Sequence, residues 1–263
     1  MSSQAAAGPA VTGLAAGPAA GQPAPSLVIA PRFCGPPDSA NGGYASGLIA
    51  ARLGGQAEIT LRRPPPLARP MAIERDGEGS VRVLDRDVLI AEGTSLPGGP
   101  AVELPGPVTI RDARAAGLGS RLRAHPDEHP FPTCFVCGPA RRPPDGLGIM
   151  PGPVAGRCLS ADAWYPDGSL ARPDGDLAPE LVWAALDCAG AIGALEDAAP
   201  DGPPYVLGRF AARQFGPVRA GEPHVVAGWR LAAEGRKLLA GSALFTATGE
   251  AVGVARATWI RLG

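Results

Sequence analysis

Residues 178–195, APELVWAALDCAGAIGAL, decide how the rest of the chain is interpreted. Pro179 near the start of this stretch is typical of the first turn of a helix, where a missing N–H costs nothing. Apolar side chains then follow on every side, and Asp187 is the one charged residue beyond the first turn. A helix that is apolar all round is buried. We therefore expect a central helix with strands packed around it.

A second, shorter helix is predicted over residues 41–53, NGGYASGLIAARL, with Asn41 as its N-cap and Gly54-Gly55 at its end. Strand-like segments bounded by Pro, Gly and Asp follow each helix. The first helix precedes residues 57–63, 71–75, 80–84 and 88–95. The second helix is preceded by 155–165 and followed by 205–215, 224–233, 237–247 and 251–260.

The two halves repeat each other. Residues 62–67 align with 213–218, and residues 88–94 align with 252–258. Between these markers the second half is longer by thirteen residues (39 against 26), so we expect a trimmed hairpin in the first copy. One helix followed by several antiparallel strands, twice over, predicts an α+β architecture in which two sheets pair side by side.

Composition sets the expected boundaries. The 37 Gly and 31 Pro among 263 residues come with 45% hydrophobic residues, too many for a disordered chain. We expect them to collect in tails, connectors and turns. The predicted organisation has four parts: a disordered Ala/Gly/Pro-rich tail over 1–26, a first domain over 27–96, a connector over 97–153 with a short helix around 110–124, and a second domain over 154–263.

The charge balance and the cysteine count limit the partners and the cellular compartment that we expect. The 24 Lys and Arg nearly balance the 25 Asp and Glu, for a net charge of −1. This balance argues against nucleic acid as a partner. The most apolar stretch, 181–195, is too short to cross a membrane, and we expect no membrane segment and no signal peptide. An odd count of five cysteines fits a reducing cytoplasm better than a disulfide framework.

Three pieces of sequence carry a resemblance to a known superfamily. They are Asn41-Gly42-Gly43-Tyr44 at a helix start, Leu61-Arg-Arg-Pro before a Pro-rich turn, and Cys134-Phe-Val-Cys-Gly138 with Gly146-Leu147 after it. Their order, with the internal repeat, resembles the double-hotdog thioesterases: the acyl-CoA thioesterase II family and hotdog proteins similar to phenylacetyl-CoA thioesterases. The resemblance implies two hotdog domains in one chain, each an antiparallel sheet wrapped around a central helix.

The same resemblance implies a composite catalytic site formed by Asn41, Gly42, Gly43 and Asp187. In such enzymes the thioester carbonyl lies at a helix N-terminus, where backbone N–H groups stabilise the developing oxyanion. A carboxylate nine positions after the signature's first residue acts as base or nucleophile, and Asp187 stands nine positions after Ala178. The implied function is hydrolysis of an acyl-CoA thioester by water that Asp187 activates. No cofactor is implied, and the chain would act as a monomer or a homodimer.

Asp187 also draws attention on physical grounds alone, because a charge on an apolar helix face is expensive unless it is paired or used. The alternative is a structural Asp bonded to a neighbouring amide. Departures from the family pattern favour a second function. Ala50 replaces the first helix's carboxylate, and Gly208 and Ala257 stand near positions where the family has a hydroxyl residue and a Gln. The alternative function is therefore an acyl-CoA-binding or acyl-binding protein without catalysis.

Other candidates have plainer interpretations. Cys134 and Cys137, with His125 and His129 upstream, could bind zinc or form a redox disulfide. The hotdog lead-in explains the pair without metal, so we expect no metal site. Cys188, about 100° around the helix from Asp187, is expected to be packing.

Polar residues elsewhere are weighed in the same way. Glu180 is expected to complement its helix dipole, with a substitute catalytic role as the alternative. His224 would need an Asp partner to act in a hydratase, and none stands at a suitable spacing. The arginines on predicted strands are expected to face solvent, with CoA phosphates as the alternative partner; they are Arg62, Arg63, Arg209 and Arg213. The tryptophans are expected to pack in the core or to line an acyl pocket; they are Trp164, Trp183, Trp229 and Trp259.

Overall fold

The structure is a computed structural model, and it describes residues 25–76, 78–196 and 202–263. The expected tail over 1–26 lies outside the described residues except for its last two positions. Ser26 already belongs to strand β1 (Ser26–Leu27), which pairs with Met71 and Ala72. Among the described residues, regular structure begins at Ser26.

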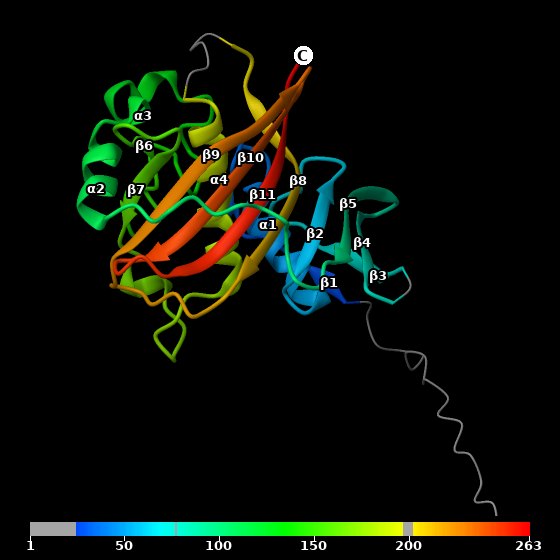
Figure 1. Ribbon diagram of the computed structural model, residues 1–263. Coiled ribbons are helices and arrows are strands. Elements are labelled where there is room, and N and C mark those ends of the chain that lie inside the picture. Colours follow the sequence, from blue (N-terminus) through cyan, green and yellow to red (C-terminus); the bar gives the residue numbers. More distant parts are fainter. Residues whose placement is uncertain (1–24, 77, 197–201) are drawn as a thin grey trace, which may run out of the picture.

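One antiparallel sheet of eleven strands runs through the described chain in the order β1-β3-β4-β5-β2-β8-β11-β10-β9-β7-β6 (Figure 1). The predicted strands are confirmed, with small shifts at their ends. The strand formed by 155–165 is shorter than expected. The bounds are β2 Ala57–Leu61, β3 Met71–Arg75, β4 Ser80–Asp85, β5 Val88–Ser95, β6 Gly152–Pro153, β7 Ser160–Trp164, β8 Tyr205–Gln214, β9 His224–Glu234, β10 Lys237–Thr246 and β11 Ala251–Arg261.

The strand order repeats about the β2–β8 junction, where Ala57 pairs with Ala212 and Thr60 with Arg209. Outward from this junction run β2-β5-β4-β3 on one side and β8-β11-β10-β9 on the other. The hairpin of β3 and β4 has strands of 5 and 6 residues, whereas β9 and β10 have 11 and 10. The first series is thus the one with the shorter hairpin, as the sequence spacing predicts.

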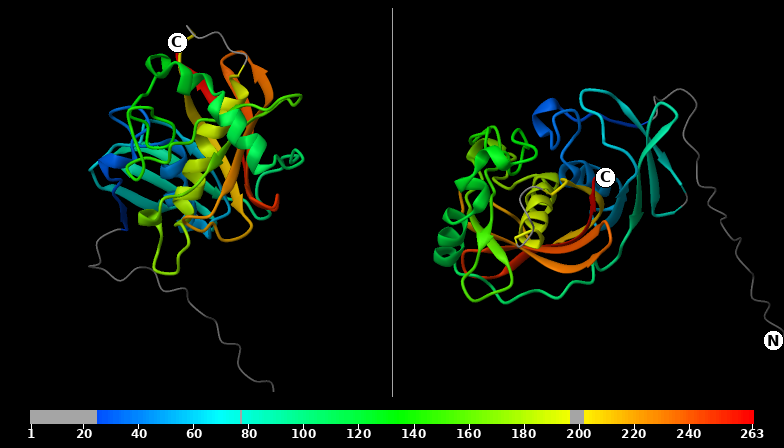
Figure 2. Two further views of the ribbon diagram at one scale, coloured as in Figure 1. Left: turned by 90° about the vertical axis from the view of Figure 1, so that its left-hand side faces the viewer. Right: turned by 90° about the horizontal axis from the view of Figure 1, so that it is seen from above.

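Helix α4 (Pro179–Ala194) lies in the concave side of the larger strand series, and the strands curve around it in the view from above (Figure 2). The helix comes so close to β9 that a Cβ on Gly228 would collide with the carbonyl oxygen of Ala189. Because side chains alternate between the two faces of a strand, β9 contributes residues to two separate clusters. Val226 belongs to the main core around α4, while Val225 and Ala227 belong to an outer cluster covered by α2 (Ile110–Leu118).

Helix α1 (Gly42–Ala50) begins as predicted: the Asn41 side chain accepts a hydrogen bond from the Tyr44 amide at 2.9 Å. Small residues let α1 pack closely against α4. A Cβ on Gly43 would lie 2.7 Å from the carbonyl oxygen of Trp183, and one on Gly47 would lie 2.7 Å from the Cα of Glu180. The N-terminus of α1 is therefore held against the middle of α4.

The predicted connector contributes to the core. Phe135, Val136 and Ile149 are fully buried in the main cluster, because this Gly/Pro-rich segment carries a short apolar run that packs on α1 and α4. The helix expected over 110–124 is two helices, α2 and α3 (Arg121–Ala124), which are separated by Gly119 and Ser120. Short 3-10 helices cover Pro31–Phe33, Ala51–Leu53, Pro126–Glu128 and Gly168–Leu170.

Among the described helices, none is both long and apolar enough to cross a membrane.

Candidate active site

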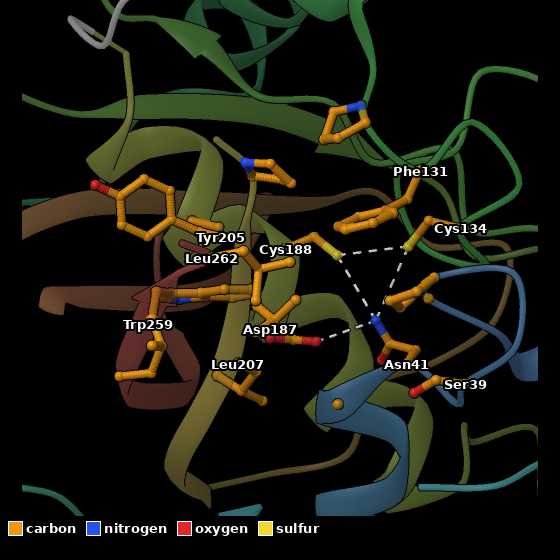
Figure 3. Close-up of a pocket in the computed structure, with 18 of the residues that line it drawn as sticks. Ser39, Asn41, Phe131, Cys134, Asp187, Cys188, Tyr205, Leu207, Trp259 and Leu262 are labelled. Carbon is orange, nitrogen blue, oxygen red and sulfur yellow. Dashed lines mark hydrogen bonds between the residues drawn. The ribbon is translucent and has the colours of Figure 1, made fainter. Parts of the chain in front are cut away.

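A cavity of about 840 Å³ lies where the N-terminus of α1 meets the middle of α4. One side is apolar and comes from the ends of β8 and β11, and the other comes from the start of α1 and from residues 128–137 (Figure 3). The volume falls in the usual range for a small-molecule site, roughly 300–1,000 Å³. Its lining includes Asn41, Gly42, Phe131, Cys134, Asp187, Cys188, Leu207 and Trp259.

The structure brings the four predicted site residues together at this cavity. Oδ2 of Asp187 accepts one hydrogen bond from the Gly43 amide at 2.8 Å and another from Nδ2 of Asn41 at 3.0 Å. Oδ1 is buried and has no hydrogen-bond partner among the described residues. The carboxyl group is therefore oriented through Oδ2 alone.

Burial dominates the electrostatics of Asp187, which is 1% exposed. Loss of hydration raises the pKa of its carboxyl from 3.8 to about 7. The Gly43 amide acts in the opposite direction, the negative charge of Cys134 raises the pKa further, and the Asn41 side chain lowers it. A carboxyl with a pKa near neutrality is suited to accept a proton during a reaction.

The two glycines at the start of α1 differ in what their amides do. The Gly43 amide is used by Asp187, whereas the Gly42 amide makes no hydrogen bond to any described residue, and Gly42 lines the cavity. The Gly43 amide thus orients the carboxylate, and the Gly42 amide is left without a partner among the described residues. Asn41 orients the carboxylate as well, because its Oδ1 caps α1 while its Nδ2 faces Asp187.

Three cysteines gather beside Asp187, which the sequence did not predict. Sγ of Cys188 lies 3.8 Å from Sγ of Cys134 and 3.7 Å from Nδ2 of Asn41 (Figure 3). Cys137 completes the group. Cys188 packs in the main core as expected, and it also lines the cavity, because a rotation of about 100° from Asp187 still leaves its side chain on that side of α4.

The three histidines differ in burial and in their contacts. His129 is buried, and its Nε2 lies 3.3 Å from Sγ of Cys137. His125 is exposed, and its Nδ1 lies 3.9 Å from Glu128. His224 is buried near Trp164 and bonds to the Glu222 carbonyl.

The remaining sequence candidates are divided between the cavity and other parts of the molecule. Arg62 and Arg63 line the cavity, and Arg62 is paired with Glu92. Arg209 forms an ion pair with Glu58 at the β2–β8 junction. Arg213 donates to the Gly98 carbonyl. Glu180 packs beside Gly47 in the first turn of α4. Of the tryptophans, Trp259 lines the cavity, Trp164 and Trp183 lie in the main core, and Trp229 lies in the outer cluster.

Sequence reasoning missed two kinds of cavity residue. Leu207 and Phe131 form apolar walls of the cavity. For Leu207, its position beside Gly208 on a predicted strand could have indicated this role; for Phe131 the sequence holds no such signal. The sequence also gave no sign that Cys188 meets Cys134, since 54 positions separate them.

Comparison with known proteins gives a structural result. No protein-family model matches the sequence, and no curated protein sequence matches it. Solved structures do match. The TesB protein of Mycobacterium avium subsp. paratuberculosis is 14% identical, with a TM-score of 0.56 over 90% of this chain and 92% of that one. Acyl-CoA thioesterase II TesB2 of Mycobacterium marinum is 15% identical, with a TM-score of 0.55 over the same shares of the two chains. The chain therefore has the hotdog-like fold of the acyl-CoA thioesterase II structures.

Proposed function

We propose that this protein hydrolyses acyl-CoA thioesters at the cavity between α1 and α4. A water molecule beside Oδ1 of Asp187 gives its proton to the carboxylate while its oxygen attacks the thioester carbon. The N–H of Gly42 donates to the carbonyl oxygen as negative charge develops there. The carbon–sulfur bond then breaks, and the CoA thiolate leaves with the proton that Asp187 had accepted. The products are a carboxylic acid and free CoA.

One observation carries this proposal: the buried carboxylate of Asp187, with one unpartnered oxygen, lies at the N-terminus of α1, where the Gly42 amide has no partner among the described residues, and Asp187 and Gly42 both line the cavity. A buried carboxyl group without a use is costly to retain. The Gly43 and Asn41 bonds hold Oδ2, so they orient the group without occupying Oδ1. The helix dipole of α1 also favours negative charge at Gly42, where the oxyanion would form.

The cavity supports an acyl-CoA as the substrate class. Its apolar wall of Leu207, Trp259 and Leu262 suits an acyl chain. Two exposed arginines on its rim, Arg63 and Arg261, form no ion pair with the described residues and suit the phosphates of CoA. The similarity in fold to acyl-CoA thioesterase II structures supports the same class.

The repeated strand order supports two hotdog units in one chain, the first built on α1 and the second on α4. In this arrangement the site lies between the units, with the free amide from one and the carboxylate from the other. A single chain then holds what two single-hotdog chains obtain by pairing, and it acts as a monomer or a homodimer. All five cysteines are free, which supports action in the reducing cytoplasm.

A second function, acyl-CoA binding without turnover, is favoured by two observations. The Gly43 amide already donates to Asp187, so a single amide is left for the carbonyl. The polar residues expected near Gly208 and Ala257 are also missing, although Gly208 lines the cavity.

A panel of acyl-CoAs of increasing chain length distinguishes the two functions. Free CoA is measured with a thiol reagent, and binding is measured by calorimetry with the same compounds. Turnover of at least one member supports the hydrolase, whereas saturable binding without any release of CoA supports the binding protein. Neither binding nor turnover across the panel would contradict both.

A further inference from the structure

The three buried cysteines beside Asp187 have the geometry of a metal site. Cys134 and Cys137 come from the loop after α3, and Cys188 comes from α4. Their sulfur atoms all lie within 4.8 Å of one another, and those of Cys134 and Cys188 are 3.8 Å apart. Sulfurs bound to one tetrahedral zinc at about 2.3 Å stand roughly 3.8 Å apart. The 3.8 Å between Cys134 and Cys188 matches this value, and Cys137 lies close enough to complete a three-sulfur site.

The side-chain amide of Asn41 points its hydrogens toward two of the three sulfurs. The Nδ2 group of Asn41 lies 3.7 Å from Sγ of Cys188 and 4.0 Å from Sγ of Cys134. Thiolates are the form of cysteine that binds metal ions.

His129 takes the role of a hydrogen-bond donor to this cluster. Its Nδ1 accepts a hydrogen bond from the Phe131 amide at 3.0 Å, so the ring hydrogen is on Nε2. Nε2 lies 3.3 Å from Sγ of Cys137 and therefore donates to that sulfur. A histidine placed in this way supports a thiolate ligand from outside the coordination sphere. Three sulfurs then remain as ligands, and all three cysteines line the cavity.

We propose that Cys134, Cys137 and Cys188 bind one zinc ion through their thiolates, with the fourth coordination position open to the cavity. Thiolate ligands favour zinc over magnesium or calcium, and binding releases the protons of the thiols. The ion links the loop of residues 130–138 to α4. The site differs from the sequence expectation of no metal, because Cys188 supplies the third ligand and His125 supplies none.

Metal content gives the test. Tag-free full-length protein is produced with zinc in the medium and analysed by plasma mass spectrometry, and metal-free protein is titrated with cobalt(II). We expect about one zinc per chain and an intense near-ultraviolet band from thiolate-to-cobalt charge transfer. Cys188→Ala should lose at least nine-tenths of the zinc and most of the band. Cys158→Ala, which removes the exposed cysteine, should keep both.

The wild-type titration alone keeps the test decisive if Cys188→Ala fails to fold. Reduced wild-type protein that binds neither zinc nor cobalt would overturn the proposal, and so would full zinc binding by Cys188→Ala. Loss of two reactive thiols without metal would indicate a Cys134–Cys188 disulfide and would also overturn it. None of these readouts depends on release of CoA, so failure of the zinc site and failure of the hydrolase are distinguished.

Discussion

A methyl group at position 43 should force α1 away from α4 and disturb the carboxylate that the two helices hold between them. In Gly43→Ala the new Cβ would lie 2.7 Å from the Trp183 carbonyl oxygen and would collide with the Cβ of Asp187. Both neighbours belong to α4, so the helices must separate. Separation stretches the 2.8 Å bond from the Gly43 amide to Oδ2 of Asp187.

The expected change in stability combines opposing contributions. Overpacking a close contact costs about 1–3 kcal/mol. Weakening the hydrogen bond to a buried carboxylate costs about 1–3 kcal/mol more. Alanine instead of glycine in a helix returns at most about 1 kcal/mol. We expect the free energy of unfolding to fall by about 3 kcal/mol, which for a chain of this size lowers the melting temperature by roughly 6–12 °C.

Gly190→Ala on α4 is the matched control. A Cβ there would meet its nearest neighbours, Ala240 and Ser242, at 3.6 Å, which is ordinary contact. Because alanine has the higher helix propensity and meets no clash here, the free energy of unfolding should rise by about 0.5–1 kcal/mol. Urea unfolding followed by fluorescence measures both variants. A Gly43→Ala variant as stable as Gly190→Ala would refute the claim that Gly43 sets the distance between α1 and α4.

Two further predictions concern the residues around Asp187 and the rim. Asn41→Ser should keep most of the helix cap and lose the donor to Asp187, so turnover falls and the free energy of unfolding falls by about 1–3 kcal/mol. Asn41→Ala should cost about 1 kcal/mol in addition, because the cap is lost as well. Urea unfolding and CoA release measure the two effects, and a Ser variant with wild-type turnover would contradict the role of Nδ2. Arg63→Ala should raise KM for acyl-CoA about threefold to tenfold at unchanged kcat, because a phosphate contact is lost. Arg209→Ala at the β2–β8 junction is the control and should leave KM unchanged. Equal KM values for the two variants would contradict the role of Arg63.

Local patterns in the sequence were sufficient for the elements and their order. Asn41 and Gly54 predicted the ends of the first helix, because a cap and a left-handed glycine act on their own neighbours. The stretch 178–195 predicted a buried helix, because a helix that is apolar on all sides must lie in the core. The shorter hairpin followed from spacing between repeated segments.

Contacts between distant segments were harder to predict. The sequence suggested that Asp187 and Asn41 belong to one site, but not that Gly43 gives its amide to the carboxylate, because this depends on how closely α1 packs on α4. Cys188 was interpreted as packing because its partner Cys134 lies in a segment that composition marks as a connector. Phe135 and Val136 bury that segment, and this burial brings Cys134 to α4.

The most direct test of the account is the rate of CoA release by Asp187→Asn. Asparagine keeps the size of the side chain and an oxygen for the Gly43 amide, but it cannot accept the proton of water. We expect kcat to fall about 10²–10⁴-fold, while Asp87→Asn on the exposed β4–β5 turn keeps the wild-type rate. Equal rates for wild type, Asp187→Asn and Asp87→Asn on an acyl-CoA that the protein hydrolyses would contradict the account.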